Sequence, residues 1–182
     1  MRAELSMLKQ LVLGKRYAIF AALLMLSWTA STPIAQAQDN LGGHIGFVLP
    51  LVTHAAGQTT NIADNFSIGF PMGITVKGKG HLAFDLELVP GIQDSPRQVS
   101  LTVHPGLIYG IGHNFAVGGR LAFDINSSQF GFTPLVNKSW PIKDKFFKAY
   151  FVEAVLPVRF NRPPGGPSSN PVTFGVHFGV AF

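Results

Sequence analysis

Nine ionisable side chains lie at positions of the same parity in an alternating sequence pattern, so one compartment of the fold could hold all of them. They are Asp85, Glu87, Asp124, Glu153, Arg120, Arg159, His44, His104 and His177. Histidines and carboxylates suit proton transfer or a divalent ion, whereas opposite charges suit a buried network of salt bridges and hydrogen bonds. The sequence has no His-x-His or His-x-x-x-His spacing, so we expect the paired network, with no metal and no cofactor.

Strands must position these residues, because apolar residues alternate with small or polar ones along most of the chain. From Val172 to Phe182 every even position is Val or Phe, and every odd position is small or polar. The same alternation predicts seven further strands, at 42–51, 65–76, 81–89, 99–109, 115–125, 130–140 and 147–160. In the strand at 42–51 the alternation places Leu51 on the apolar face. In the strand at 147–160, Phe151 and Val155 depart from the alternation. No segment shows a helical period, so the fold class is all-β.

The segments between the expected strands indicate an up-and-down meander. Those at 54–64, 90–98 and 161–171 are longer than those at 77–80 and 110–114. The segments at 54–64 and 161–171 are polar and would project outward, where loops on a rigid scaffold can bind a partner. The sequence does not say what that partner is. Lys143, Lys145 and Lys148 form a small basic patch that we interpret as a solvated turn with flanking strand.

Residues 1–37 have the pattern of a cleaved signal peptide. Basic residues precede an apolar run at 17–30, and Ala35-Gln36-Ala37 supplies a small-residue cleavage site. The apolar run is shorter than the ~17–25 residues of a membrane-spanning helix. We therefore expect cleavage after Ala37 and a single domain at 38–182, with translation starting at Met1 or Met7.

Composition excludes several classes of function. The chain has no cysteine, which rules out disulfides, thiol catalysis, Cys-bound zinc and a lipidated cysteine. The net charge of +5 comes largely from the basic residues of the expected leader. The expected mature chain, 38–182, is close to neutral and lacks the excess of basic residues typical of nucleic-acid-binding proteins.

The apolar face of the strands is expected to face outward. A soluble sandwich or lipocalin-like barrel also alternates, but its water-facing side carries many charges. Here charged residues make up 13% of the chain, about half of the ~25% usual in soluble domains. The second face is rich in Gly, Ala, Ser and Thr, which suit a narrow lumen, and the strands match the ~9–11 residues that cross a bilayer. A sheet can span lipid only as a closed barrel.

The alternating strands and the aromatic C-terminus resemble small eight-stranded outer-membrane β-barrels of the OmpA transmembrane-domain and OmpX type. The resemblance implies an antiparallel up-and-down transmembrane barrel of eight strands in the outer membrane of a Gram-negative-type bacterium. It also implies three kinds of partner: outer-membrane lipid, the export pathway and the barrel-assembly machinery. In that family the last strand carries the signal that the machinery reads, which here is Phe174, Val176, Phe178, Val180 and Phe182.

The resemblance implies a structural, surface-interaction or minor solute-permeability role, the last being porin-like. Two alternatives stay open at this point. One is an outer-membrane lipid-modifying hydrolase or acyltransferase, although no serine lies beside a histidine in the sequence. The other is a periplasmic soluble β-barrel or sandwich that binds a ligand.

Overall fold

The computed structural model describes residues 40–125, 127–161 and 169–182. The predicted signal peptide lies outside them. The strands are β1 (Leu41–Ala55), β2 (Gln58–Asn61), β3 (Ser67–Gly69), β4 (Met72–Lys77), β5 (Leu82–Gln93), β6 (Gln98–Gly112), β7 (Phe115–Asp124), β8 (Phe130–Pro141), β9 (Ala149–Val155), β10 (Val158–Phe160) and β11 (Val172–Ala181). Two of the eight expected strands are interrupted, so β3–β4 and β9–β10 each make one strand of the barrel.

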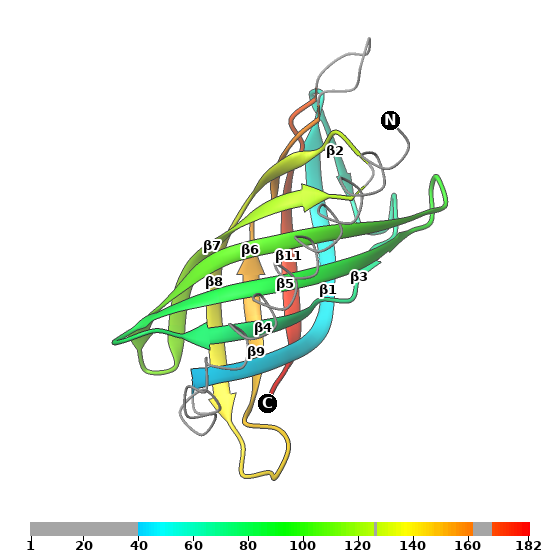
Figure 1. Cartoon of the computed structure of the whole chain (residues 1–182). Helices are drawn as coiled ribbons and strands as arrows, with labels where there is room; N and C mark the ends of the chain where they lie inside the picture. Colours follow the sequence, from blue (N-terminus) through cyan, green and yellow to red (C-terminus); the bar gives the residue numbers. More distant parts are fainter. Residues whose placement is uncertain (1–39, 126, 162–168) are drawn as a thin grey trace, which may run out of the picture. The chain divides into compact units, whose positions relative to one another are not determined.

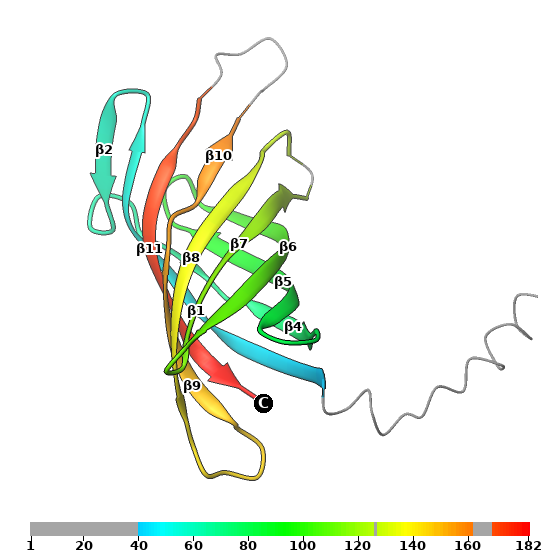
Figure 2. The same ribbon diagram turned by 90° about the vertical axis from the view of Figure 1, so that its left-hand side faces the viewer.

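The strands close into a barrel because the last one pairs with the first. Each neighbouring pair is antiparallel, and β11 pairs with β1 from His44↔Ala181 to His54↔Val172. The ladder ends at Gly43 and Phe182, whose backbone N–H groups each donate to the other residue's carbonyl at 2.9 Å. Figures 1 and 2 show the tilted strands wrapping around one axis. The chain is an eight-stranded up-and-down β-barrel, as predicted.

The two interruptions occur at prolines, which lack a backbone N–H for the ladder. At Pro71, between β3 and β4, the carbonyl still accepts from Gly46 N at 2.9 Å. At Pro157, between β9 and β10, the carbonyl accepts from Thr173 N at 2.8 Å. The ladder is therefore locally distorted at these points but remains connected.

Two expectations about β1 are wrong. The segment at 54–64 is not a simple loop, because β1 continues to Ala55 and β2 folds back on it as a hairpin. Leu51 is not on the outer face, because a register shift between Pro50 and Val52 reverses the parity. Val52 then faces outward with 42% of its surface exposed. Thr53 bonds Thr173 across the β1–β11 pair, with 2.9 Å between their hydroxyl oxygens.

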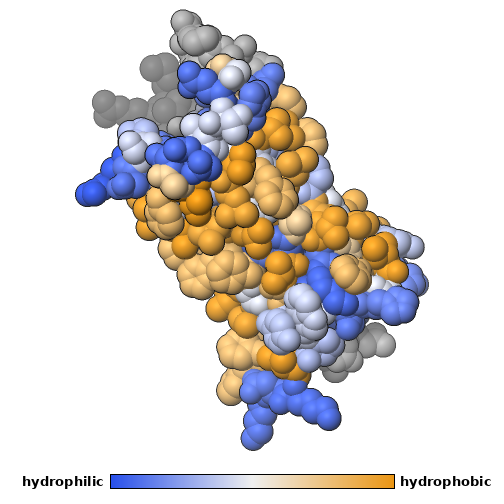
Figure 3. Space-filling view, turned by 180° about the vertical axis from the view of Figure 1, so that it is seen from behind, coloured by the Kyte–Doolittle hydropathy of each residue, from blue (hydrophilic) through white to orange (hydrophobic). Residues whose placement is uncertain are grey.

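Polarity is inverted relative to a water-soluble fold. Among the described residues six apolar side chains are buried, Pro71, Val89, Ala122, Leu135, Phe151 and Val155, while eight buried side chains are polar or charged. Large apolar residues such as Leu121 (53%), Leu107 (54%) and Phe130 (49%) are exposed on the outside. In Figure 3 hydrophobic residues gather over the middle of one face, and hydrophilic residues gather toward its ends. Such an exterior fits hydrocarbon, and the interior is the polar lumen of a transmembrane barrel.

Aromatic side chains gather at both ends of the outer surface. At one end Trp140 and Tyr150 stack with ring centroids 5.3 Å apart, and Lys138 Nζ lies 4.1 Å from the Phe115 ring centroid. At the other end Phe130 and Phe160 are 5.3 Å apart. Aromatic girdles of this kind mark the two interfaces of a bilayer. No helix in the described part of the chain has the length and apolar character needed to cross a membrane.

Candidate functional site

Arg120 of β7 holds together three buried carboxylates at the centre of the lumen. Its Nε donates to Asp85 Oδ2 at 2.7 Å, and its Nη1 and Nη2 donate to the two oxygens of Glu153 at 3.1 and 3.3 Å. Glu87 lies further away, with 3.7 Å between Nη2 and Oε1. All four residues are at most 4% exposed. The paired fork of donors matches a carboxylate well, which makes this a strong arrangement for a buried charge.

Three histidines surround this centre, each bound to a carboxylate. His44 Nε2 of β1 lies 3.0 Å from Glu87 Oε1, and His104 Nδ1 of β6 lies 3.2 Å from Glu87 Oε2. On β11, His177 Nδ1 lies 2.8 Å from Glu153 Oε2. The network therefore joins strands from all around the barrel, although these residues are far apart in the sequence.

The remaining two predicted residues lie at the edge of the network. Arg159 of β10 donates from Nη2 to His104 Nε2 at 3.1 Å and from Nη1 to Thr133 Oγ1 at 3.2 Å. Asp124 has the inward parity of Arg120, but its Oδ1 accepts from Thr102 Oγ1, at 2.6 Å, and not from a member of the network. Eight of the nine candidates are thus linked, and Asp124 stands beside them.

Sequence reasoning did not assign the neutral members of the network. Thr75 donates to Asp85 Oδ1 at 2.7 Å, and Asn137 Nδ2 donates to Glu153 Oε1 at 3.2 Å. Both lie at inward positions of the alternation, so the same parity would have predicted them as residues of the lumen. Phe151 and Val155, which break the pattern, are buried in the lumen, and Phe151 packs edge-on against His177 with centroids 4.9 Å apart.

Two inward glycines make room for the histidine rings. A Cβ on Gly73 would meet the imidazole of His44, and one on Gly46 would lie 2.9 Å from His177 Nε2. A side chain at position 73 would push the His44 ring away, and one at position 46 would collide first with the backbone carbonyl of Phe178 on the neighbouring strand. The rings therefore lie directly against the barrel wall.

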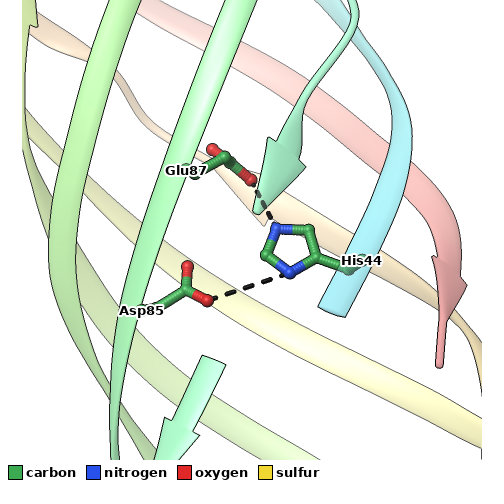
Figure 4. Close-up of side chains that lie close together, drawn as sticks. All are labelled: His44, Asp85 and Glu87. Atoms are coloured by element: carbon green, nitrogen blue, oxygen red, sulfur yellow. Dashed lines mark hydrogen bonds and ion pairs between the residues drawn. The ribbon is translucent and has the colours of Figure 1, made fainter. Parts of the chain in front are cut away.

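His44, Asp85 and Glu87 form a corner whose ligand-type atoms all lie within 4.8 Å of one another. Figure 4 shows the His44 ring between the two carboxylates, with Nε2 toward Glu87 and Nδ1 toward Asp85 at 3.8 Å. Carboxylate and imidazole groups can bind a divalent ion. Here, however, the Arg120 guanidinium already contacts Asp85 and would repel such an ion. We therefore interpret the corner as part of the ion-paired network.

One end of the lumen is hollow. A cavity of about 630 Å³, here called the vestibule, extends from the charged centre to the end of the barrel where Leu41 and Phe182 lie. Small inward residues leave this space: Gly42, Ala116, Ala149 and Ala181. His44, Asp85, Arg120 and Glu153 form its floor, and the exposed Lys77 and Lys148 line its mouth.

The turn at the same end, between β8 and β9, is organised by Asp144. Its Oδ1 accepts from Phe146 N at 2.7 Å and from Phe147 N at 3.0 Å. These two backbone donors, chiefly that of Phe147, hold the pKa of Asp144 below its ordinary value. The turn carries Lys143 and Lys145 of the basic patch and is exposed, as expected for a solvated connection.

The C-terminal strand has the outward parity predicted for Phe174, Val176, Phe178, Val180 and Phe182. Phe182 is 48% exposed, and its ring lies across Gly43, where a Cβ would collide with it. Its backbone also makes the last two hydrogen bonds of barrel closure. Deleting Phe182 would therefore remove both the ring and its two backbone hydrogen bonds to Gly43. Changing only the side chain leaves these hydrogen bonds in place.

Replacing Phe182 by Ala separates these two contributions. Because the ring is half exposed, we expect a loss of at most about 1.5 kcal/mol in the unfolding free energy of the refolded barrel. If the aromatic end is read during assembly, the amount of Phe182→Ala barrel inserted in cells falls much further than this stability loss explains. Phe123→Ala, also outward and 46% exposed but outside the C-terminal strand, is the matched control. Equal insertion of both variants would contradict a special role for the terminal ring.

Comparison with known proteins adds two distant structural likenesses. No family model matches the chain, and no curated protein matches it. A structure titled "De novo design of transmembrane beta-barrels" aligns with 11% identity and a TM-score of 0.38, covering 78% of this chain and 96% of that one. The outer membrane protein OprG from Pseudomonas aeruginosa aligns with 11% identity and a TM-score of 0.36, covering 78% and 95%. With scores this low, the fold assignment rests on the strand pairing and polarity of the chain itself.

Proposed function

We propose that this protein is an integral outer-membrane β-barrel with a closed lumen, whose role is structural or the presentation of its loops at the surface. The observation that carries the proposal is the ion network around Arg120, in which charged side chains at most 4% exposed occupy the middle of the lumen. Eight strands leave an interior that side chains can fill. The apolar exterior and the aromatic ends support a bilayer as the surroundings.

The biogenesis that goes with this proposal has three parts: export, insertion by the barrel-assembly machinery, and residence in outer-membrane lipid. The outward row from Phe174 to Phe182 supports an assembly signal at the C-terminus. The hairpin of β1 and β2, exposed along Gln58–Asn61, is a polar surface for a partner outside the membrane. That partner stays unidentified.

Enzymatic action on lipid is less well supported. The inward Ser139 at the vestibule donates to the backbone carbonyl of Asn114 at 3.4 Å. The three lumen histidines are bound to carboxylates of the network. A serine nucleophile would need a histidine base within hydrogen-bond reach.

Minor permeability is the second candidate, and the vestibule is the observation that favours it. The cavity reaches from the end of the barrel as far as Arg120, so a continuous path would require the ion network itself to rearrange.

Planar bilayers test the closed lumen directly. We expect the purified wild-type barrel to show little or no stable conductance, because the paired charges cannot leave the lumen without losing their partners. Regular single-channel steps from the wild type would reject the closed lumen and favour the permeability role.

Cysteine labelling provides an independent measurement, since the chain has no native cysteine. Ala149→Cys places a thiol in the vestibule, and Thr173→Cys places one on the inner wall beyond the network. In vesicles with one barrel orientation, an impermeant thiol reagent added outside should label one of the two. Labelling of both from the same side would show an open path.

A further inference from the structure

We infer that His44 carries a proton and supplies a positive charge that the buried network lacks, so that the stability of the closed lumen depends on pH. The inference rests on the closed lumen proposed above, but its tests report on histidine and not on conduction. It follows from a charge count and from which atoms can donate a hydrogen bond.

The network is short of positive charge. Asp85, Glu87 and Glu153 carry three negative charges, against one on Arg120. Arg159 adds a second positive charge where it meets His104, and the half-buried Asp124 adds a further negative one nearby. The net charge of the network is negative whether or not Arg159 and Asp124 are included. A buried charge without a partner is costly, so another cation is expected.

Two of the three histidines are poor candidates for that cation. His104 Nε2 faces a guanidinium nitrogen of Arg159, which can only donate, so this ring nitrogen must accept and the ring is neutral. His177 Nε2 is buried without a hydrogen-bond partner among the described residues. A proton there would be an unsatisfied donor, whereas a neutral ring with its proton on Nδ1 still donates to Glu153.

His44 is the histidine with a carboxylate on each side. Nε2 lies 3.0 Å from Glu87 Oε1 and Nδ1 lies 3.8 Å from Asp85 Oδ1. The other titratable or charged groups around it are Arg120 on β7, the His177 ring on β11 at 6.1 Å, Glu153 on β9 and His104 on β6 behind Glu87. Lys77 on β4 and Lys148 before β9 lie at the vestibule mouth. Both carboxylates lie beside the ring, whereas Arg120 makes no hydrogen bond to it and its positive charge opposes the proton from further away. His44 also lines the vestibule, through which protons can exchange with water.

The sign of the pH dependence follows from proton counting. Above about pH 6.5 an unfolded histidine is neutral, while the folded barrel keeps the proton on His44. The folded state then binds one more proton than the unfolded chain, so stability falls as pH rises. The contribution of the His44 proton to the stability of the barrel is fully present below about pH 6.5. It is lost once His44 loses its proton in the folded barrel.

Reversible urea unfolding in lipid vesicles measures this contribution. Between pH 7 and the pH at which His44 loses its proton, the unfolding equilibrium constant of the wild type should rise by about tenfold per pH unit, the value for one proton. His44→Gln keeps a polar side chain but cannot take the proton, so its slope should be smaller by that amount. His54→Gln, at an exposed histidine outside the lumen, should keep the wild-type slope. Equal slopes for wild type and His44→Gln would overturn the inference.

Nitrogen-15 spectra of the histidine rings give a second readout that needs no variant. At pH 7 we expect the signals of a doubly protonated ring for His44 and of neutral rings protonated on Nδ1 for His104 and His177. A neutral His44 with the proton on Glu87 would overturn the inference even if the barrel proved closed. Channel activity together with a protonated His44 would instead refute the closed lumen alone.

Discussion

Arg120→Ala should lower the unfolding free energy of the barrel by about 3–5 kcal/mol, the range for removing one partner of a buried ion pair. The substitution leaves Asp85, Glu87 and Glu153 together with no guanidinium between them. Two of these carboxylates lose direct hydrogen bonds from Arg120, at 2.7 Å for Asp85 and at 3.1 and 3.3 Å for Glu153. Urea unfolding in vesicles measures the loss.

The matched control is Arg97→Ala. Its guanidinium lies 3.9 Å from Asp94, and 88% of the Arg97 side chain is exposed. Such surface pairs contribute about 0–1 kcal/mol. Combining Arg120→Ala with Glu153→Gln should recover part of the loss, because one buried charge then disappears with its partner. A cost for Arg120→Ala no larger than that for Arg97→Ala would mean that the network does not hold the barrel together.

Leu121→Arg tests the outward face and should cost about 2–4 kcal/mol in a bilayer. Leu121 is in β7 beside Arg120 and is 53% exposed, so the arginine would point into hydrocarbon. In a water-soluble barrel the same change at so exposed a position would fall within about 0.5 kcal/mol. Vesicle refolding and urea unfolding distinguish the two cases.

Val99→Arg is the control for depth in the membrane. Val99 is 74% exposed and lies near the end of β6, next to the turn from β5. There the cost should fall to about 0–1 kcal/mol, as near an interface. If Leu121→Arg cost no more than Val99→Arg, the apolar face would not lie in a bilayer.

The face of most residues could be predicted from the sequence, because a strand alternates with a fixed period of two. Phe123 and Leu121 point outward and Arg120 and Ala122 inward, as this parity requires. The predicted face is wrong where a register shift interrupts the alternation. At Leu51 the register shift after Pro50 reverses the face; a proline within a strand is typical of a bulge, but it does not say where the extra residue falls.

The sequence by itself therefore determined the fold class, the strand order and which charged residues share the lumen. Only the tertiary structure decided how those residues pair. Contacts such as Arg120 with Glu153 depend on the tilt and stagger of strands β7 and β9 around the closed barrel, and parity says nothing of height along the axis. The same stagger places His44 between Asp85 and Glu87 although more than forty positions separate it from them in the chain. Parity assigns each side chain to a face, whereas barrel closure fixes which of the inward side chains meet.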